Sequence, residues 1–164
     1  MDESPAMDLP AASAPPRGGD NLPVPLTSFV GRAPQIDDVK HLLAAGRLVT
    51  LTGSGGCGKT RLAIQVATAV RHGYHDGVWF ADLSRLTDPA LVAQAVLTAI
   101  GLREEPGRGS LASLMEHLRG RYLLILLDNC EHLLEECARF IGTLLVVSTE
   151  TVSYTHLTLP TILR

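Results

Sequence analysis

Eight consecutive residues, GSGGCGKT, have the types and spacing needed to hold a phosphate chain. They match the pattern G-x-x-x-x-G-K-[ST] (Walker A) in full, with a β-branched apolar run before them and a helical pattern after them. The glycines let the backbone curl so that several N–H groups point into one concavity, at the positive end of the next helix. We therefore predict a phosphate loop for a nucleotide, formed by Gly53, Ser54, Gly55, Gly56, Cys57, Gly58, Lys59, Thr60 and Arg61.

Within this loop, single side chains have separate predicted roles. Lys59 is expected to reach the β- and γ-phosphates, and Thr60 to offer its hydroxyl to Mg²⁺. Arg61 is equally compatible with a phosphate contact and with a solvated place on the helix surface. Cys57 is read as a small residue at a variable loop position rather than as a redox switch.

A carboxylate at the end of an apolar run supplies the second half of the site. Asp128 closes YLLILLD, and an aspartate at the carboxyl end of a buried parallel strand is typical of a Mg²⁺ ligand (Walker B). It could also cap the helix that follows. The next residue, Asn129, cannot accept a proton, so we expect slow hydrolysis or another base. Glu131 is a candidate base, or an exposed carboxylate favoured by the helix dipole. The predicted catalytic residues are Lys59, Asp128 and Glu131, and the predicted Mg²⁺ ligands are Thr60 and Asp128.

Strands and helices alternate along the chain. The apolar patterns predict strands over 48–53, 77–83 and 122–128, and helices over 34–46, 59–71, 88–100, 110–120 and 133–144. Asp88, followed by Pro89, and Ser110 are the predicted N-caps of the third and fourth helices. An almost wholly apolar run such as 122–128 indicates a strand that is covered on both faces in a parallel sheet. The alternation predicts a three-layer α/β phosphate-loop fold with a parallel sheet and right-handed crossovers.

Composition excludes several classes of protein. The formal net charge of −3 argues against a nucleic-acid surface on this segment. The chain has neither a signal-peptide pattern nor an apolar run of the ~18–20 residues that a membrane helix needs, so a cytoplasmic location without membrane contact is expected. Cys130 and Cys137 are read as reduced packing residues, and the histidines show no metal-binding spacing. Residues 1–25 hold most of the prolines and are predicted to be a disordered tail rich in Pro, Ala and Gly.

Three stretches together resemble a known family. FVGR at 29–32, GSGGCGKTRLA and LLILLDNCEHLL are similar to the signal-transduction ATPases with numerous domains, an NB-ARC-like and AAA-like class. The closest resemblance is to the nucleotide-binding domain of bacterial LuxR-type and AfsR-like transcriptional regulators, over about residues 26–145. It implies that Phe29, Val30, Gly31 and Arg32 lie against the adenine and ribose. Ala33 departs from the family, which usually has an acidic residue there.

The resemblance implies the strand order 5-1-4-3-2, of which residues 26–145 supply about three of five core strands, a truncated domain. Val146–Glu150 is only a faint echo of the family's sensor strand and has no arginine. The strand before the phosphate loop is therefore expected to lack a native ladder neighbour on either side, although the tail could pair there by accident and rescue compactness. Orphaned backbone groups cost about 1–3 kcal/mol each, so we expect the isolated chain to fold poorly and to bind ATP weakly.

The last segment, residues 146–164, is predicted to be a tail outside the family. VSYTHLTLPT, at 152–161, resembles translated sequencing-library adapter, which indicates an artefactual origin. It is uncharged and rich in threonine, so residues 152–159 could form a strand by propensity alone, with a sticky edge.

The predicted function is binding of ATP or ADP with Mg²⁺ by the N-terminal half of a regulatory switch ATPase from a multidomain transcriptional regulator, with slow hydrolysis in the full-length parent. The implied partners are downstream winged-helix, sensor-repeat and DNA-binding domains, and a nucleotide-dependent oligomer of the parent. One alternative is a small phosphotransferase (kinase), for which Arg103, Arg108, Arg119 and Arg121 are scattered lid candidates. Another is an inactive gene fragment.

Overall fold

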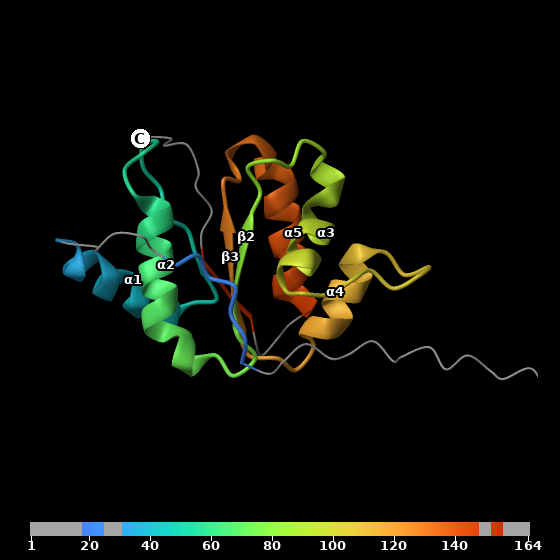
Figure 1. The fold of residues 1–164 in the computed structure, drawn as a ribbon, viewed down its shortest axis with the longest axis horizontal. Coiled ribbons are helices and arrows are strands. Elements are labelled where there is room, and N and C mark those ends of the chain that lie inside the picture. Colours follow the sequence, from blue (N-terminus) through green and yellow to red (C-terminus); the bar gives the residue numbers. More distant parts are fainter. Residues whose placement is uncertain (1–17, 25–30, 148–151, 156–164) are drawn as a thin grey trace, which may run out of the picture.

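The computed structural model describes residues 18–24, 31–147 and 152–155, and within them helices and strands alternate as predicted (Figure 1). The helices are α1 (Ala33–Ala45), α2 (Lys59–Val70), α3 (Val92–Ala99), α4 (Ser110–Leu118) and α5 (Leu134–Val147), with short 3₁₀ turns η1 (Arg71–Gly73), η2 (Pro89–Leu91) and η3 (Glu131–Leu133). The strands are β1 (Leu48–Val49), β2 (Val78–Asp82), β3 (Leu123–Asp128) and β4 (Val152–Thr155).

The four described strands form one parallel sheet in the order β1-β4-β3-β2. This is the 1-4-3-2 part of the order that the family resemblance implies. β1 has a ladder neighbour on one side, because Leu48 is in register with Tyr154 of β4, a residue of the segment whose accidental pairing the sequence allowed. The same Tyr154 is in register with Ile125 of β3. The β-prone, uncharged segment thus supplies the ladder between the two strands that carry the predicted site.

Each face of the sheet has its own apolar core. In Figure 1, α1 and α2 cover one face, and α3, α4 and α5 cover the other. Side chains of successive strand residues alternate between the faces. Even-numbered Val78, Leu124 and Leu126 pack with α1 and α2. The odd-numbered residues pack under α3, α4 and α5, and all six residues of β3 are buried. The sandwich explains why the sequence of β3 is an almost unbroken apolar run.

Local signals set most helix boundaries. Asp88 caps η2 as predicted, because its Oδ1 accepts a hydrogen bond from the N–H of Ala90 at 2.9 Å. The predicted cap of α4 is different, since Gly109 holds the N-cap position and the Ser110 hydroxyl donates to Glu104 Oε2 at 2.5 Å. A serine hydroxyl that finds a carboxylate in the preceding loop no longer serves the helix end.

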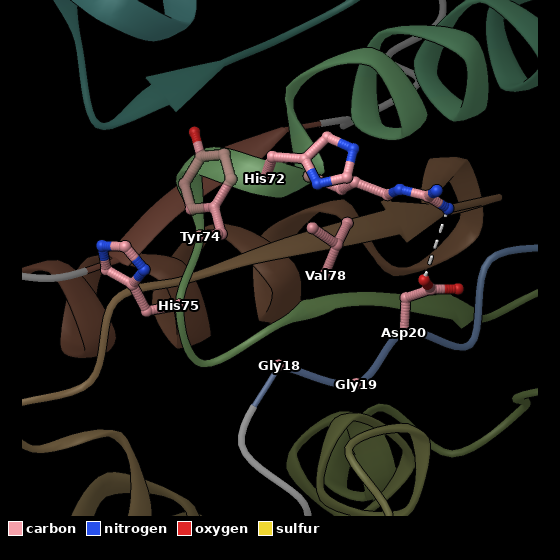
Figure 2. A pocket seen from close by; sticks show the side chains of 8 residues that line it. Gly18, Gly19, Asp20, His72, Tyr74, His75 and Val78 are labelled. Carbon is pink, nitrogen blue, oxygen red and sulfur yellow. Dashed lines mark ion pairs between the residues drawn. The ribbon is translucent and has the colours of Figure 1, made fainter.

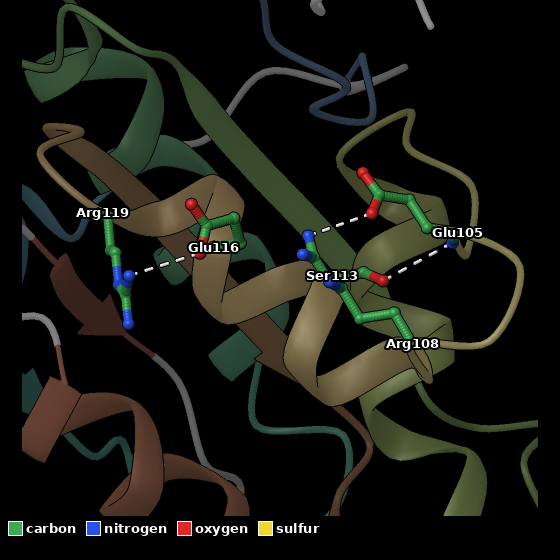
Figure 3. Close-up of polar contacts among 5 residues, drawn as sticks. All are labelled: Glu105, Arg108, Ser113, Glu116 and Arg119. Atoms are coloured by element: carbon green, nitrogen blue, oxygen red, sulfur yellow. Dashed lines mark hydrogen bonds and ion pairs between the residues drawn. The ribbon is translucent and has the colours of Figure 1, made fainter.

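The loop between α3 and α4 is tied to α4 by polar contacts (Figure 3). The N–H of Glu105 donates to Ser113 Oγ at 3.5 Å. Glu105 also pairs with Arg108 at 3.0 Å, and Arg119, which follows the last residue of α4, pairs with Glu116 of that helix at 3.3 Å. Two arginines considered as phosphotransferase lid residues are therefore engaged with acidic neighbours on this side of the molecule.

Residues 18–24 lie along the outer edge of β2. The N–H of Val78 donates to Gly19 O at 3.1 Å. The Asn21 side chain pairs with the backbone of Phe80 as a neighbouring strand would. Its Oδ1 accepts a hydrogen bond from the N–H of Phe80 at 2.6 Å, and its Nδ2 donates to Phe80 O at 2.9 Å. Nδ2 also donates to Ala99 O at 3.1 Å. This part of the predicted tail is thus bonded to the sheet, whereas residues 1–17 and 25 lie outside the described residues.

Gly77 lets this segment come close. Its φ is +105°, and a Cβ built there would lie 2.3 Å from Gly19 O. Only glycine combines that backbone angle with that contact.

In the described part of the chain, no helix has both the length and the apolar character needed to cross a membrane.

Candidate functional site

The GSGGCGKT segment forms the turn between β1 and α2, at the carboxyl edge of the sheet. Gly53, Gly56 and Gly58 have φ values of +153°, +74° and +85°. Side chains rarely tolerate such values, so these glycines are required by the turn itself. Gly58 is the N-cap of α2, and the helix begins at Lys59. The exposed N–H groups of the first helical turn therefore follow directly on the loop.

Lys59 folds back across its own loop. Its Nζ donates to Gly53 O and to Ser54 O, both at 2.9 Å. The Cys57 Sγ lies 3.9 Å from the same nitrogen, and a Cβ built on Gly53 would lie 3.0 Å from that sulfur. Bonds to neutral carbonyls are weaker than charge-assisted bonds to phosphate oxygens. The ammonium is thus held beside the loop by partners that a phosphate could replace.

Thr60 and Asp128 join α2 to the end of β3. The Thr60 hydroxyl donates to Asp128 Oδ2 at 2.8 Å, and Asp128 is only 3% exposed. The alternative role of Asp128 as a helix cap is not realised, because Cys130 holds the N-cap position of η3. A hydroxyl and a carboxylate are oxygen donors of the kind that Mg²⁺ takes, and Mg²⁺ commonly binds through one or two carboxylates plus phosphates and waters. The residues present therefore fit a magnesium–phosphate group.

Arg32 reaches the loop from the start of α1. Its Nη2 donates to Cys57 O at 2.7 Å, and its guanidinium lies 3.6 Å from a Cβ built on Gly58. The resemblance implied that Gly31 and Arg32 contact the base and ribose, whereas Arg32 here contacts the phosphate loop. Phe29 and Val30, the other two residues of that prediction, lie outside the described residues. Arg61 lies on the exposed side of α2.

Sequence reasoning did not single out Asp82, the last residue of β2. Its Oδ1 accepts hydrogen bonds from Asn129 Nδ2 at 2.8 Å and from the N–H of Ser84 at 2.9 Å. Burial raises the pKa of Asp82, but these hydrogen bonds and the nearby Arg85 charge outweigh burial and hold it below the ordinary value. Asn129 has φ +57°, a left-handed conformation that asparagine tolerates. One signal in the sequence could have pointed to Asp82: VWFAD and LLILLD, the sequences of β2 and β3, both end in aspartate.

Glu131 is exposed at the first position of η3. It lines a cavity of about 430 Å³ with Pro89, His132 and Arg139, and no residue of 53–60 lines that cavity. The lining of this cavity comes from η2, η3 and α5. A second cavity, of about 230 Å³, lies where the Gly18–Asp20 segment meets η1 and the start of β2 (Figure 2). It is at the sheet edge opposite the phosphate loop.

Cys130 and Cys137 are fully buried side by side, as packing residues should be. A hydrogen bond with Cys137, burial and the Asp128 charge raise the pKa of Cys130 above its ordinary value, so this thiol stays protonated. Over the described ranges, no group of three or more His, Cys, Asp or Glu is arranged to hold a metal ion. Any Mg²⁺ at the loop would thus depend on phosphate oxygens and water for most of its ligands.

Residues 43–159 match the sequence profile of a family described as the AAA domain, and the match contains the loop, Asp128 and β4. The chain belongs to the AAA domain family. This AAA domain is 48% identical over 107 residues to a Mycobacterium tuberculosis protein named as an HTH-type transcriptional regulator, covering 65% of this chain and 12% of that protein. It is 34% identical over 126 residues to the regulatory protein AfsR of Streptomyces coelicolor, covering 66% of this chain and 13% of AfsR.

The fold of this AAA domain is also that of a solved structure. The Aeropyrum pernix ORC2 protein, solved as ADPNP–ADP complexes, has a TM-score of 0.63 over 86% of this chain and 44% of that chain, at 18% identity. The chain spans 30% of the length of the first curated relatives and about an eighth of the regulators. The family match extends to residue 159 and so includes most of the segment predicted to lie outside the family.

Proposed function

We propose that this AAA domain binds ATP or ADP together with Mg²⁺ and acts as the nucleotide-dependent switch of a transcriptional regulator. The observation that carries the proposal is the hydrogen bond of 2.8 Å between Thr60 and Asp128, directly beside the glycine turn. It joins the two predicted magnesium ligands from separate elements. A structural glycine turn would need neither this pair nor a lysine folded over the loop.

Each residue of the site has a role that its position supports. The N–H groups of the 53–60 turn and of the first turn of α2 would hold the phosphates, and Lys59 would leave its carbonyl partners to pair with them. Thr60 and Asp128 would hold Mg²⁺, which neutralises phosphate charge when bound. Arg32 would brace the turn through Cys57 O. Gly31 and the FVGR residues before it would face the base and ribose.

Hydrolysis by this site is proposed to be slow. The residue after Asp128 is an asparagine whose amide already donates to Asp82. Glu131 lines a separate cavity. Slow turnover suits a switch, because the bound nucleotide persists long enough to bias neighbouring domains. The name of one relative, an HTH-type transcriptional regulator, supports a DNA-binding domain in the parent protein. From the family resemblance we also propose downstream winged-helix and sensor-repeat domains, nucleotide-dependent oligomers of the parent and a cytoplasmic location.

Calorimetry of the purified chain with ATP and Mg²⁺ tests the proposal. Lys59→Ala and Asp128→Asn are each expected to weaken binding at least 100-fold. Lys40→Ala is the matched control, because Lys40 is a lysine paired with Asp37 at 3.1 Å on the outside of α1. Wild-type binding that needs neither Lys59 nor Mg²⁺ would refute the proposal.

We further propose that the VSYTHLTLPT string is adapter-derived and that β4 fills the place of a native strand by its β propensity. The support is the resemblance of the string itself, its lack of charge and its threonine content. Resequencing the source DNA across codons 146–164 tests this. A clean read that encodes the same string in the genome would overturn it.

A further inference from the structure

Asp82 and Asp128 stand at the same end of neighbouring strands and on the same face of the sheet. Their Cα atoms are register partners in the β2–β3 ladder. Side chains along a strand alternate between the two faces of the sheet. Val78 and Leu124 are even-numbered like the two aspartates and pack against α1 and α2, so Asp82 and Asp128 lie on that face. Asp128 confirms it by accepting the Thr60 hydrogen bond from α2. The two aspartates therefore end adjacent strands, whose backbones lie about 4.8 Å apart, on the face of the sheet that α1 and α2 cover.

The Asp82 carboxylate is also held in a fixed orientation. Asn129 Nδ2 and the N–H of Ser84 both donate to Oδ1, from the end of β3 and from the turn after β2. The N–H of Leu83 donates to Asp128 O at 3.0 Å, which extends the pairing of the two strand ends past the ladder. Asp82 is exposed at the carboxyl end of β2, so its carboxylate is open to solvent at the edge of the sheet where a solvated ion would sit.

We propose that Asp82 is a positioning residue of the magnesium site: its carboxylate accepts a hydrogen bond from a water bound to Mg²⁺, while Asn129 holds the carboxylate in place. The inference rests on the proposed function. Mg²⁺ dehydrates reluctantly and keeps several waters, so a carboxylate beyond its direct ligands is well placed to hold one of them. Loss of such an outer partner typically costs 10–100-fold in metal affinity.

The competing explanation is that Asp82 only caps the turn that begins at Ser84. Asp88 caps η2 in this way, because its Oδ1 accepts a hydrogen bond from the N–H of Ala90, two residues further along the chain. The two aspartates make the same local contact, but only Asp82 also contacts the strand that ends in Asp128. Asp88→Asn is therefore a matched control for Asp82→Asn.

Nucleotide affinity of the full chain, measured with Mg²⁺ and again with EDTA, tests the inference. Asp82→Asn keeps an oxygen that can accept both hydrogen bonds and removes only the charge. It is expected to weaken ATP binding about tenfold with Mg²⁺ and less than twofold in EDTA. Asp88→Asn is expected to change neither value. Titration of Mn²⁺ in place of Mg²⁺, followed by electron paramagnetic resonance, should show the same loss for Asp82→Asn.

Asn129→Ala is the second variant, since it leaves the Asp82 charge and removes the side chain that orients it. A loss of about threefold, again confined to the Mg²⁺ condition, is expected. Equal losses with and without Mg²⁺ for both variants would show a structural role and overturn the inference. So would unchanged affinity in both variants while wild type responds to Mg²⁺. If wild type shows no response to Mg²⁺ at all, the proposed function fails and this inference fails with it.

Discussion

The two halves of the sheet are built differently. β2 and β3 pair from Val78↔Leu124 to Asp82↔Asp128, under three helices on one face and with the Asn21 side chain bonded along the outer edge. β1 covers two residues, and within the part of the chain that the structure describes both are paired with β4. Leu48 is 41% exposed, whereas every residue of β3 is buried. The phosphate loop leaves from the less supported half.

The difference shows how stability and chemistry are divided. Hydrophobic burial is concentrated where β3 lies between two apolar cores, and burial is the main favourable term in folding. The loop is held instead by polar contacts: Lys59 to its own carbonyls, Arg32 to Cys57 O, and Thr60 to Asp128. A ligand that binds only the folded form adds stability by mass action. Nucleotide is thus expected to stabilise the β1 half more than the β2–β3 half.

The largest expected effect is from truncating the buried half. Leu126→Ala removes a fully buried side chain from between the two layers and should lower the free energy of unfolding by about 2–5 kcal/mol. Leu48→Ala, at the exposed strand, should cost less than about 1 kcal/mol. Urea denaturation measures both. Equal costs would break the comparison between the halves.

The second largest effect is expected from acid, which should destabilise the β2–β3 half. Burial lowers the pKa of His117 in α4 to about 4, aided by Arg121 and opposed by Asp76. The unfolded chain takes up this proton below about pH 6.5 and the folded chain does not, so stability is complete above that pH and falls toward pH 4, by at most roughly 3 kcal/mol. Thermal melts at pH 7, 6 and 5 should show a loss that His117→Gln reduces. If His117→Gln lost stability over the same pH range and by the same amount as the wild type, His117 would not be the cause of the acid effect.

β4 gives a test of the less supported half. Tyr154→Pro removes the N–H of a residue in register with both Leu48 and Ile125, and should raise the cost of ordering β1 by about 1–3 kcal/mol. Hydrogen exchange at β1 and in the loop should accelerate, while exchange in β2 stays slow. Tyr154→Phe keeps the N–H and serves as the control. Unchanged exchange at β1 after Tyr154→Pro would show that β4 does not support it.

The smallest effect is expected at the outer edge of β2. Asn21→Ala removes hydrogen bonds to Phe80 N, Phe80 O and Ala99 O from an exposed side chain, which should lower stability by about 1 kcal/mol. Asn21→Asp keeps the acceptor for Phe80 N but sets a carboxylate oxygen against the carbonyl oxygens of Phe80 and Ala99, so it should cost at least as much as Asn21→Ala. Thermal denaturation gives the sizes. A larger effect than that of Tyr154→Pro would reverse the ranking of the two edges.

Local patterns predicted the elements well, because they act within a few residues. The apolar run before Asp128 gave β3, and the Asp88–Pro89 pair gave the start of η2. The phosphate loop with Thr60 and Asp128 followed from spacing and strand context, and the structure joins those two residues by a hydrogen bond. β1 is shorter than its apolar run, because strand length depends on a neighbour as well as on propensity.

The remaining features depend on residues far apart in sequence. Asn21 meets Phe80 and Ala99 through its side chain, and composition around Asn21 gave no sign of this. The pairing of β4 with β1 could be expected only as an accident, since strand propensity alone does not say which partner a strand finds. Asp82 was missed because its importance arises only when β2 and β3 lie in register and bring it beside Asp128.

Gly77 makes the outer edge of β2 unusually sensitive to a single methyl group. With Gly19 O so near the missing Cβ, Gly77→Ala would force the protein to give up either the backbone path into β2 or the docked N-terminal strap. Because the strap is the cheaper loss, the variant should keep its sheet and shed residues 18–24. A one-carbon change would therefore uncover a sheet edge, which favours edge-to-edge association.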